Sequence, residues 1–168
     1  MTTSVVRRLG LPFWHPAVLL ATWIGAGLLP VTPGTWGSLA ALPFAWVIQS
    51  RWGDLGLLVA ALLVFAVGCR VSGIVAQASG VKDAGAIVID EVAAQWLVLT
   101  AAPLDPVGYT LGFLLFRVAD ILKPWPASWA DRHVGGGLGV MLDDVFAAIY
   151  AGGVLSAIIL AGRFILGH

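Results

Sequence analysis

The fold of this chain is decided by the stretch LGLLVAALLVFAVGCRVSGIVAQA (residues 55–78), in which Arg70 is the only charged residue. A helix of about 24 residues is about 36 Å long, which is enough to cross the roughly 30 Å hydrocarbon core of a bilayer. A second long apolar stretch occupies residues 145–162. The lengths of both stretches favour helices over strands, so they predict two membrane-crossing helices.

The composition of the whole chain supports a membrane protein. Of its 168 residues, 60% are hydrophobic and 11% are charged, and the mean hydropathy is +0.96. An average globular domain is about half apolar and about a quarter charged. The net charge is zero, so no basic field indicates a nucleic-acid partner. Cys69 is the only cysteine, which excludes an intramolecular disulfide and a CxxC site.

The remaining apolar segments are shorter than the roughly 20 residues that a crossing requires. They occupy residues 17–29, 37–49, 92–102 and 107–119. The sequences RWGD (51–54) and APLDP (102–106) predict tight polar turns between segments. We therefore expect an all-α fold, with one compact multi-helix integral membrane domain over residues 1–168. Some of its helices are expected to be short or re-entrant, and no obligate protein partner is evident.

The charges suggest how the chain is oriented. If the Gly/Pro-rich stretch at residues 25–38 faces the cytoplasm, the two polar turns lie on the far side of the membrane. The basic residues that then share the cytoplasmic side, as the positive-inside rule favours, are Arg7, Arg8, Lys82, Lys123 and Arg132. No small-residue cleavage site follows the first apolar segment, so we expect this segment to be retained.

The acidic residues are unusual because most of them fall in three clusters near the cytoplasmic side. Seven carboxylates left in lipid would cost about 20 kcal/mol on insertion scales, more than a typical stability of about 5 to 15 kcal/mol. They must therefore contact water, a cation or basic partners. These seven residues are Asp83, Asp90, Glu91, Asp120, Asp131, Asp143 and Asp144.

The first cluster lies in DAGAIVIDE (residues 83–91). On one helix, Asp83 and Asp90 share a face and Glu91 lies about 100° away. Neighbouring carboxylates repel, and a hard divalent ion such as Mg²⁺ or Ca²⁺ would hold them ionised. The alternative is a helix N-terminus whose acids interact with the helix dipole.

The second cluster lies in FRVADILKPWP (residues 116–126). Arg117 and Asp120 are three residues apart on one helix face, and Lys123 precedes a proline that should end the helix. Two cations and an acid at a helix end would clamp a phosphate beside a metal. The alternative is a structural salt bridge and a lysine whose amine reaches water.

The third cluster lies in ADRHVGGGLGVMLDDVFAAIYAG (residues 130–152). Its glycines predict a flexible loop, with Asp143 and Asp144 at the start of the last helix and Asp131 and His133 nearby. Aspartate is also a common N-cap, so a capping role for either residue is the alternative.

The Gly/Pro-rich sequence GAGLLPVTPGTWGS (residues 25–38) could form an anion-binding nest of backbone N–H groups, with Thr35 or Ser38 capping the next helix. A plain turn is the alternative. No GKS or GKT follows, so the segment is not a Walker A motif.

Taken together, PVTPGTWGS, DAGAIVIDEVAAQW, FRVADILKPWP and GVMLDDVFAAIYAG resemble, in the same order, the signature blocks of the phosphatidylglycerophosphatase A family. The resemblance covers roughly residues 25–152. It implies a small Mg²⁺-dependent phosphatase of the bacterial inner membrane, with several membrane passes and an interfacial active site on the cytoplasmic face. Its phospholipid substrate would be phosphatidylglycerophosphate, whose terminal phosphate is removed to give phosphatidylglycerol.

The resemblance and the residue types give one hypothesis for the site. In this hypothesis the acids bind the metal ion and take part in catalysis, while the basic side chains and the loop at residues 33–38 hold the phosphate. The expected metal ligands are Asp90, Glu91, Asp143 and Asp144. Asp83 and Asp120 are further ligand or base candidates. The expected substrate-binding residues are Thr35, Ser38, Arg117, Lys123 and Arg132.

Several alternatives stay open at this point. The nucleophile would be a water on the metal, or one acid would form an aspartyl-phosphate, and His133 is an option for protonating the leaving group. Intramembrane carboxylates also mark ion or proton transporters, although acids near turns and helix ends favour an interfacial site. A lipid phosphatase acting on another phospholipid monoester is the remaining rival.

Overall fold

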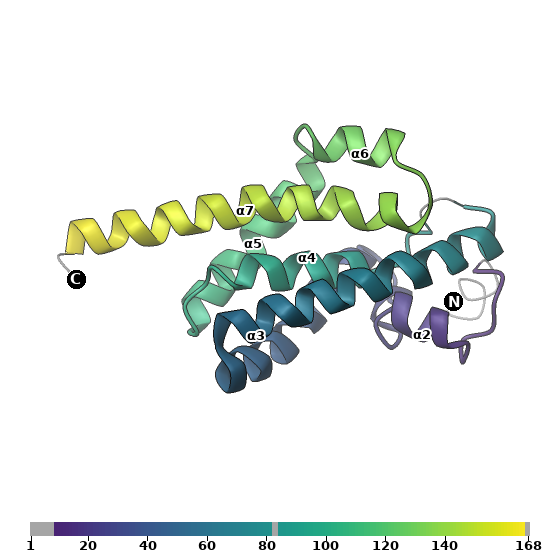
Figure 1. Cartoon of the computed structure of the whole chain (residues 1–168), viewed down its shortest axis with the longest axis horizontal. Helices are drawn as coiled ribbons and strands as arrows, with labels where there is room; N and C mark the ends of the chain where they lie inside the picture. The colour runs from purple at the N-terminus through teal and green to yellow at the C-terminus, as the bar shows by residue number, and fades with distance from the viewer. Residues whose placement is uncertain (1–8, 82–83, 167–168) are drawn as a thin grey trace.

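The computed structural model describes residues 9–81 and 84–166. Within these residues the chain forms helices and turns and no strand, which confirms the all-α prediction (Figure 1). The helices are α2 (Pro16–Ala21), the 3-10 helix η1 (Ala26–Leu28), α3 (Pro33–Ser79), α4 (Ile89–Leu99), α5 (Pro106–Leu122), α6 (Ala127–His133) and α7 (Gly136–Leu166).

Helix α3 is a hairpin of two arms that fold back at Gly53. This residue has φ 65° and ψ −169°, a conformation that glycine adopts because it has no Cβ. The predicted turn at RWGD is therefore confirmed, and the arms comprise residues 33–52 and 54–79. Gln49 Nε2 donates to Asp54 Oδ1 at 2.7 Å, which braces the turn.

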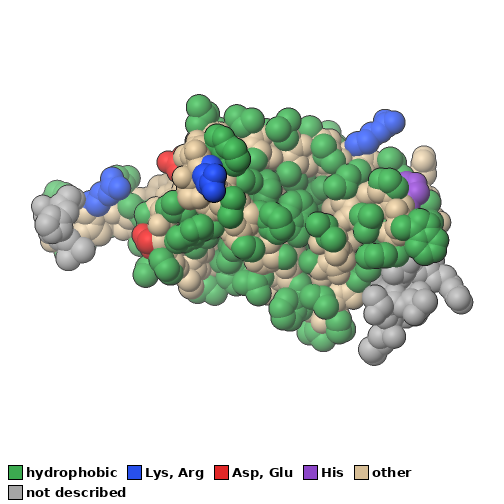
Figure 2. All heavy atoms as spheres, turned by 90° about the horizontal axis from the view of Figure 1, so that it is seen from below, with side chains coloured by type: hydrophobic (Ala, Val, Ile, Leu, Met, Phe, Trp, Pro, Cys, Tyr) green, Lys and Arg blue, Asp and Glu red, His purple; other side chains and the backbone are tan. Residues whose placement is uncertain are grey.

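Two helices, α3 and α7, are long and apolar enough to cross a membrane. The arms of α3 have about 20 and 26 residues, or about 30 and 39 Å. The C-terminal part of α7 projects beyond the other helices (Figure 1). On the face shown in Figure 2, hydrophobic side chains form a broad belt, and the charged side chains lie toward its two ends. These are the features of a membrane protein.

Helix α4 occupies the centre of the bundle, between α3 and α7 in Figure 1. It has 11 residues, too few to cross a bilayer, and nine of them are buried. Ala93 and Ala94 have no exposed surface, so neighbouring helices approach closely at these two positions. The indole of Trp96 donates to the carbonyl of Ala41 at 2.9 Å and joins α4 to the first arm of α3. Longer helices therefore enclose the short one.

The two predicted turns meet at one end of the bundle. Gln49 Nε2 donates to the carbonyl of Ala102 at 3.0 Å, and the hydroxyl of Tyr109 donates to Gln49 Oε1 at 2.6 Å. Asp105 caps α5 by accepting from the N–H of Gly108 at 2.8 Å. The starts of α3 and α4 and the end of α5 consequently lie at the opposite end. This is the relative placement that the sequence predicts.

The prediction of a flexible glycine-rich loop before the last helix is wrong. Helix α7 begins at Gly136, so Asp143 and Asp144 lie about two turns inside it and not at its start. A Cβ added to Gly137 would lie 1.9 Å from the carbonyl oxygen of Cys69. Gly137 allows α7 to pack closely against the second arm of α3. Because this packing involves a helical Gly137, this part of the segment belongs to a helix and not to a loop.

Two further local predictions are corrected. Helix α3 begins at Pro33 with Thr32 as its N-cap, so residues 33–38 are helical and do not form a loop nest. Thr35 and Ser38 lie inside the helix, and the Ser38 hydroxyl donates to the carbonyl of Gly34 at 2.9 Å. The proline at the first helical position, with its fixed φ, explains the earlier start.

The segment before α4 also differs from the expectation. Residues 84–88 are not helical, so Asp90 does not share a continuous helix with the region of Asp83. Asp90 and Glu91 stand in the first turn of α4, which was the alternative interpretation. Asp83 itself lies outside the described residues.

Candidate active site: a buried carboxylate cluster

Three carboxylates from two helices converge at the start of α4. Asp90 and Glu91 come from its first turn and Asp144 from α7, and one oxygen of each lies within 4.8 Å of the others. This spacing suits a single metal ion, and carboxylate oxygens are the ligands that Mg²⁺ and Ca²⁺ prefer. The start of α4 adds the positive end of a helix dipole. The structure thus brings together three of the four predicted metal ligands.

Two carboxylate oxygens of this cluster are buried. No hydrogen-bond partner within residues 9–81 and 84–166 reaches Glu91 Oε2 or Asp144 Oδ2. A buried carboxylate oxygen without a partner is costly unless a proton or a cation reaches it. Burial raises the pKa of Glu91 to about 8. Its hydrogen bond with Asp90 and the charge of Arg117 lower this pKa, while Asp144 and Asp120 raise it. The donor set therefore fits a hard divalent cation.

A glycine makes room for Glu91 on the α3 side. A Cβ added to Gly34 would lie 2.0 Å from Glu91 Oε1 and 3.3 Å from Arg117 Nη1. Any larger residue would occupy the space of the carboxylate. The PGT sequence at the start of α3 thus contributes the absence of a side chain, whereas the sequence predicted a nest of backbone N–H groups there.

Arg117 forms the cationic side of the cluster. Its Nη1 atom lies 2.9 Å from Asp120 Oδ2, which confirms the predicted pair on one face of α5, and it donates to the Ser38 hydroxyl at 3.2 Å. Among the described residues, its buried Nε atom has no hydrogen-bond partner. Ser38 and Asp120 thus fix the guanidinium, and its Nε–H group can still donate a hydrogen bond to an anion.

Lys123 engages the fourth predicted metal ligand. It is the C-cap of α5, as predicted from the following proline, and its Nζ lies 2.5 Å from Asp143 Oδ2 and 3.8 Å from Asp131 Oδ1. Burial lowers the pKa of Lys123, but the hydrogen bond to Asp143 and the nearby carboxylates of Asp143, Asp144 and Asp131 raise it more, so the amine stays protonated. Asp143 therefore pairs with Lys123 and is not part of the three-carboxylate group.

The acids and both cations line one pocket of about 300 Å³. The predicted residue Thr35 also lines it. Arg132 does not, and it lies exposed in the last turn of α6. His133 is likewise exposed there, with Nδ1 2.9 Å from the carbonyl of Trp129. Pro33 and Gly34, from the 33–38 segment that was expected to hold the phosphate, line the pocket too. The further lining residues carry no charge to mark them in the sequence and were not predicted: Thr32, Gly85, Ile87 and Ile121.

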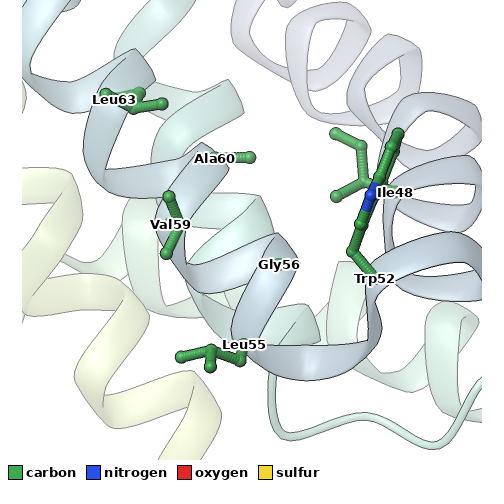
Figure 3. Close-up of a pocket in the computed structure, with 7 residues that line it drawn as sticks. All are labelled: Ile48, Trp52, Leu55, Gly56, Val59, Ala60 and Leu63. Carbon is green, nitrogen blue, oxygen red and sulfur yellow. The ribbon is translucent and has the colours of Figure 1, made fainter.

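A larger pocket of about 490 Å³ lies beside the turn of α3, between its two arms. Figure 3 shows Ile48 and Trp52 on the first arm facing Val59 and Leu63 on the second. Its lining is apolar and includes no titratable side chain. The apolar pocket therefore has no acid, base or metal ligand among its described lining residues, and the carboxylate pocket is the candidate active site.

Comparison with known proteins identifies the family of the chain. The family model described as Phosphatidylglycerophosphatase A matches residues 19–159. The chain is 41% identical over 145 residues to Phosphatidylglycerophosphatase A of Escherichia coli (strain K12), which covers 84% of this chain and 81% of that protein. It is also 41% identical over 145 residues to Phosphatidylglycerophosphatase A of Haemophilus influenzae, covering 86% and 89%.

A third relative has a different name. Over 163 residues the chain is 32% identical to a protein of Bacteroides thetaiotaomicron named Putative phosphatidylinositol-3-phosphatase, and the alignment covers 89% of this chain and 95% of that protein. No solved structure matches the chain significantly. The names of all three relatives describe removal of a phosphate from a phospholipid.

Proposed function

Because the chain belongs to the phosphatidylglycerophosphatase A family and is therefore a phosphoric monoester hydrolase, we propose that it removes the terminal phosphate of phosphatidylglycerophosphate to give phosphatidylglycerol, a step of glycerophospholipid biosynthesis. The observation that carries the proposal is the single pocket in which Arg117 and Lys123 face the carboxylates of Asp90, Glu91 and Asp144. Phosphoryl transfer depends mainly on positioning and charge neutralisation, and this pocket offers both.

The cofactor in this proposal is Mg²⁺, held by Asp90, Glu91 and Asp144. When bound, the ion neutralises phosphate charge and lowers the pKa of water. The support is the oxygen-only donor set and the two buried carboxylate oxygens that lack a hydrogen-bond partner among the described residues. Asp143, the remaining expected ligand, contributes by orienting Lys123.

The cationic residues bind and orient the phosphate. Protonated Lys123 donates to a non-bridging oxygen, and the free Nε–H of Arg117 donates to another, so both stabilise negative charge in the transition state. Water attacks phosphorus, a new P–O bond forms, and the ester P–O bond to the glycerol breaks. Asp120 lines the pocket and is our candidate for accepting the proton of the attacking water. The glycerol alkoxide leaves and takes a proton from water, and Asp120 returns its proton to water, so the enzyme is restored.

The proposal also places the enzyme in a bacterial inner membrane as a multi-pass protein, with the pocket on the cytoplasmic side. Support comes from the two apolar helices of spanning length and from the apolar belt in Figure 2. The two polar turns lie at the end of the bundle opposite the pocket. The basic residues expected on the cytoplasmic side include Lys123, which lines the pocket.

A different phospholipid monoester is the second candidate substrate. The Bacteroides relative is named for a phosphatidylinositol phosphate, and its alignment covers nearly the whole of both chains. The family shows the chain to be a phosphatase, so the transporter interpretation of the acids loses its support. The two candidate substrates differ in the headgroup that carries the phosphate, so a comparison of lipids with different headgroups distinguishes them.

Phosphate release by the purified protein tests the proposal. Phosphatidylglycerophosphate, phosphatidylinositol 3-phosphate and phosphatidate are compared in mixed micelles with Mg²⁺ and with a chelator. We expect the first lipid to be preferred and the chelator to abolish release. Absence of release from all three lipids with every divalent ion would refute the function, and a preference for another lipid would refute the substrate.

The metal ligands are tested in the same assay. Asp90→Asn and Asp144→Asn should lose activity and should no longer bind Mn²⁺, detected by its paramagnetic resonance. Asp54→Asn is the matched control, since Asp54 lies in the far turn and an asparagine oxygen can still accept from Gln49.

A further inference from the structure

The pocket opens beside an apolar surface at the end of α5. Ile121 lines the carboxylate pocket, yet 72% of its surface is exposed. Thr32, on the α3 side of the same pocket, is exposed as well. Gly85, from the segment before α4, lines the pocket and is exposed too. The mouth of the pocket therefore lies where Thr32, Gly85 and Ile121 reach the surface.

An apolar track leads away from this mouth along α5. Leu114, Val118 and Ile121 are spaced four and three residues apart, so they share one helix face. They are 52%, 55% and 72% exposed, and no charged residue interrupts the face between them. The track extends for about 10 Å from the pocket toward the middle of the bundle.

The opposite edge of the mouth carries an apolar side chain in an uncommon backbone conformation. Val31 has φ 66° and Thr32 has φ 48°, although β-branched residues rarely enter the left-handed region. Val31 is 78% exposed beside the pocket-lining Thr32. Strained backbone of this kind persists mainly at functional sites, and here it places an apolar side chain at the pocket edge.

We propose that this track binds the acyl chains of the phospholipid substrate, which enters the pocket sideways from the bilayer between Val31 and Ile121. This inference rests on the proposed function, because a lipid phosphomonoester must place its phosphate among the carboxylates while its chains stay in apolar surroundings. Many other apolar side chains are exposed on the belt, and this track is the one that begins at Ile121, which lines the pocket itself. The apolar pocket of Figure 3 lies at the opposite end of the bundle.

The test compares two substrates that share a headgroup. One is phosphatidylglycerophosphate and the other is its deacylated, water-soluble counterpart. Leu114→Asn and Val118→Asn should raise KM for the lipid about fivefold or more, since each removes an apolar contact with a chain. Their kcat for the lipid and their kcat/KM for the soluble compound should stay at the wild-type values. Val118→Leu should restore the wild-type KM.

Val47→Asn is the matched control, because Val47 is also 55% exposed but lies on the first arm of α3, toward its far end. Equal KM changes for Val118→Asn and Val47→Asn would overturn the proposal. So would equal loss on the lipid and on the soluble compound, which would mean that the substitution disturbs the pocket. Release from neither substrate by the wild-type protein would instead refute the proposed function.

Photo-crosslinking provides a second measurement that does not depend on turnover of the soluble compound. A substrate lipid with a diazirine in an acyl chain should label residues 114–121, and excess unlabelled substrate should suppress this labelling. Labelling spread over the belt and insensitive to competition would overturn the acyl-chain path even if the enzyme is active.

Discussion

Replacement of Gly34 by alanine should separate catalysis from stability. The new Cβ would lie 2.0 Å from Glu91 Oε1, whereas real Cβ contacts are essentially never under 3.0 Å. The carboxylate must therefore move by about 1 Å. Because this oxygen is the far end of a flexible side chain, the fold can accommodate the change at little cost. A displacement of about 1 Å in a catalytic group can reduce the rate by about 10²-fold.

The expected result is a kcat/KM about 10²-fold below wild type and weaker Mn²⁺ binding. The free energy of unfolding should be unchanged or higher by about 0.5 to 1 kcal/mol, since alanine is favoured over glycine inside a helix. Phosphate release and Mn²⁺ binding report the first effect, and thermal unfolding in detergent reports the second. Gly152→Ala is the control, because nothing lies within 4 Å of its added Cβ.

Wild-type turnover by folded Gly34→Ala protein would refute the reasoning, because it would mean that the position of Glu91 does not matter. A large loss of stability would refute the expected structural accommodation, because it would show that the Glu91 carboxylate cannot move aside. Equal loss in the Gly152 variant would point to a general effect of alanine in these helices.

Three further predictions follow from the same structure. Asp144→Asn should reduce phosphate release by about 10²-fold or more while thermal unfolding shows a folded protein, and near-normal release would exclude Asp144 from the site. In metal-free protein the pKa of Glu91 is raised to about 8, so the folded state binds an extra proton and stability should fall as pH rises from about 4.5 to 8. Glu91→Gln should make this slope in the melting temperature shallower, and an unchanged slope would assign it to another group. Gly137→Ala should destabilise the protein by about 2 kcal/mol or more, because its Cβ meets the backbone oxygen of Cys69, and an unchanged melting temperature would contradict the close packing of α7 on α3.

Much of the fold could be predicted from local signals. The helix ends at Gly53, Asp105 and Lys123 follow from a glycine, an N-cap with its proline, and a proline after the last turn, all of which act within a few residues. The start of α7 could not be predicted in this way. Its glycines signal a loop locally, and their packing against Cys69 depends on a helix more than sixty residues away in the sequence.

The candidate site shows the same division. The convergence of the three acidic clusters was predicted, because isolated carboxylates are too costly in an apolar bundle. The roles of Asp143 and Asp144 could not be assigned, since adjacent helical residues point about 100° apart and only packing decides which one faces Asp90. The structure turns Asp144 to the carboxylates and Asp143 to Lys123.

The charge of the pocket links metal and substrate. It is lined by five carboxylates and two cationic side chains, a formal excess of three negative charges when all are ionised. In metal-free protein a raised pKa of Glu91 reduces this excess through protonation. A phosphate monoester brings up to two more negative charges, so we expect it to bind more tightly when a cation replaces the proton and neutralises the acids. Mg²⁺ and the phospholipid should therefore raise each other's affinity by the same factor, as thermodynamic linkage demands.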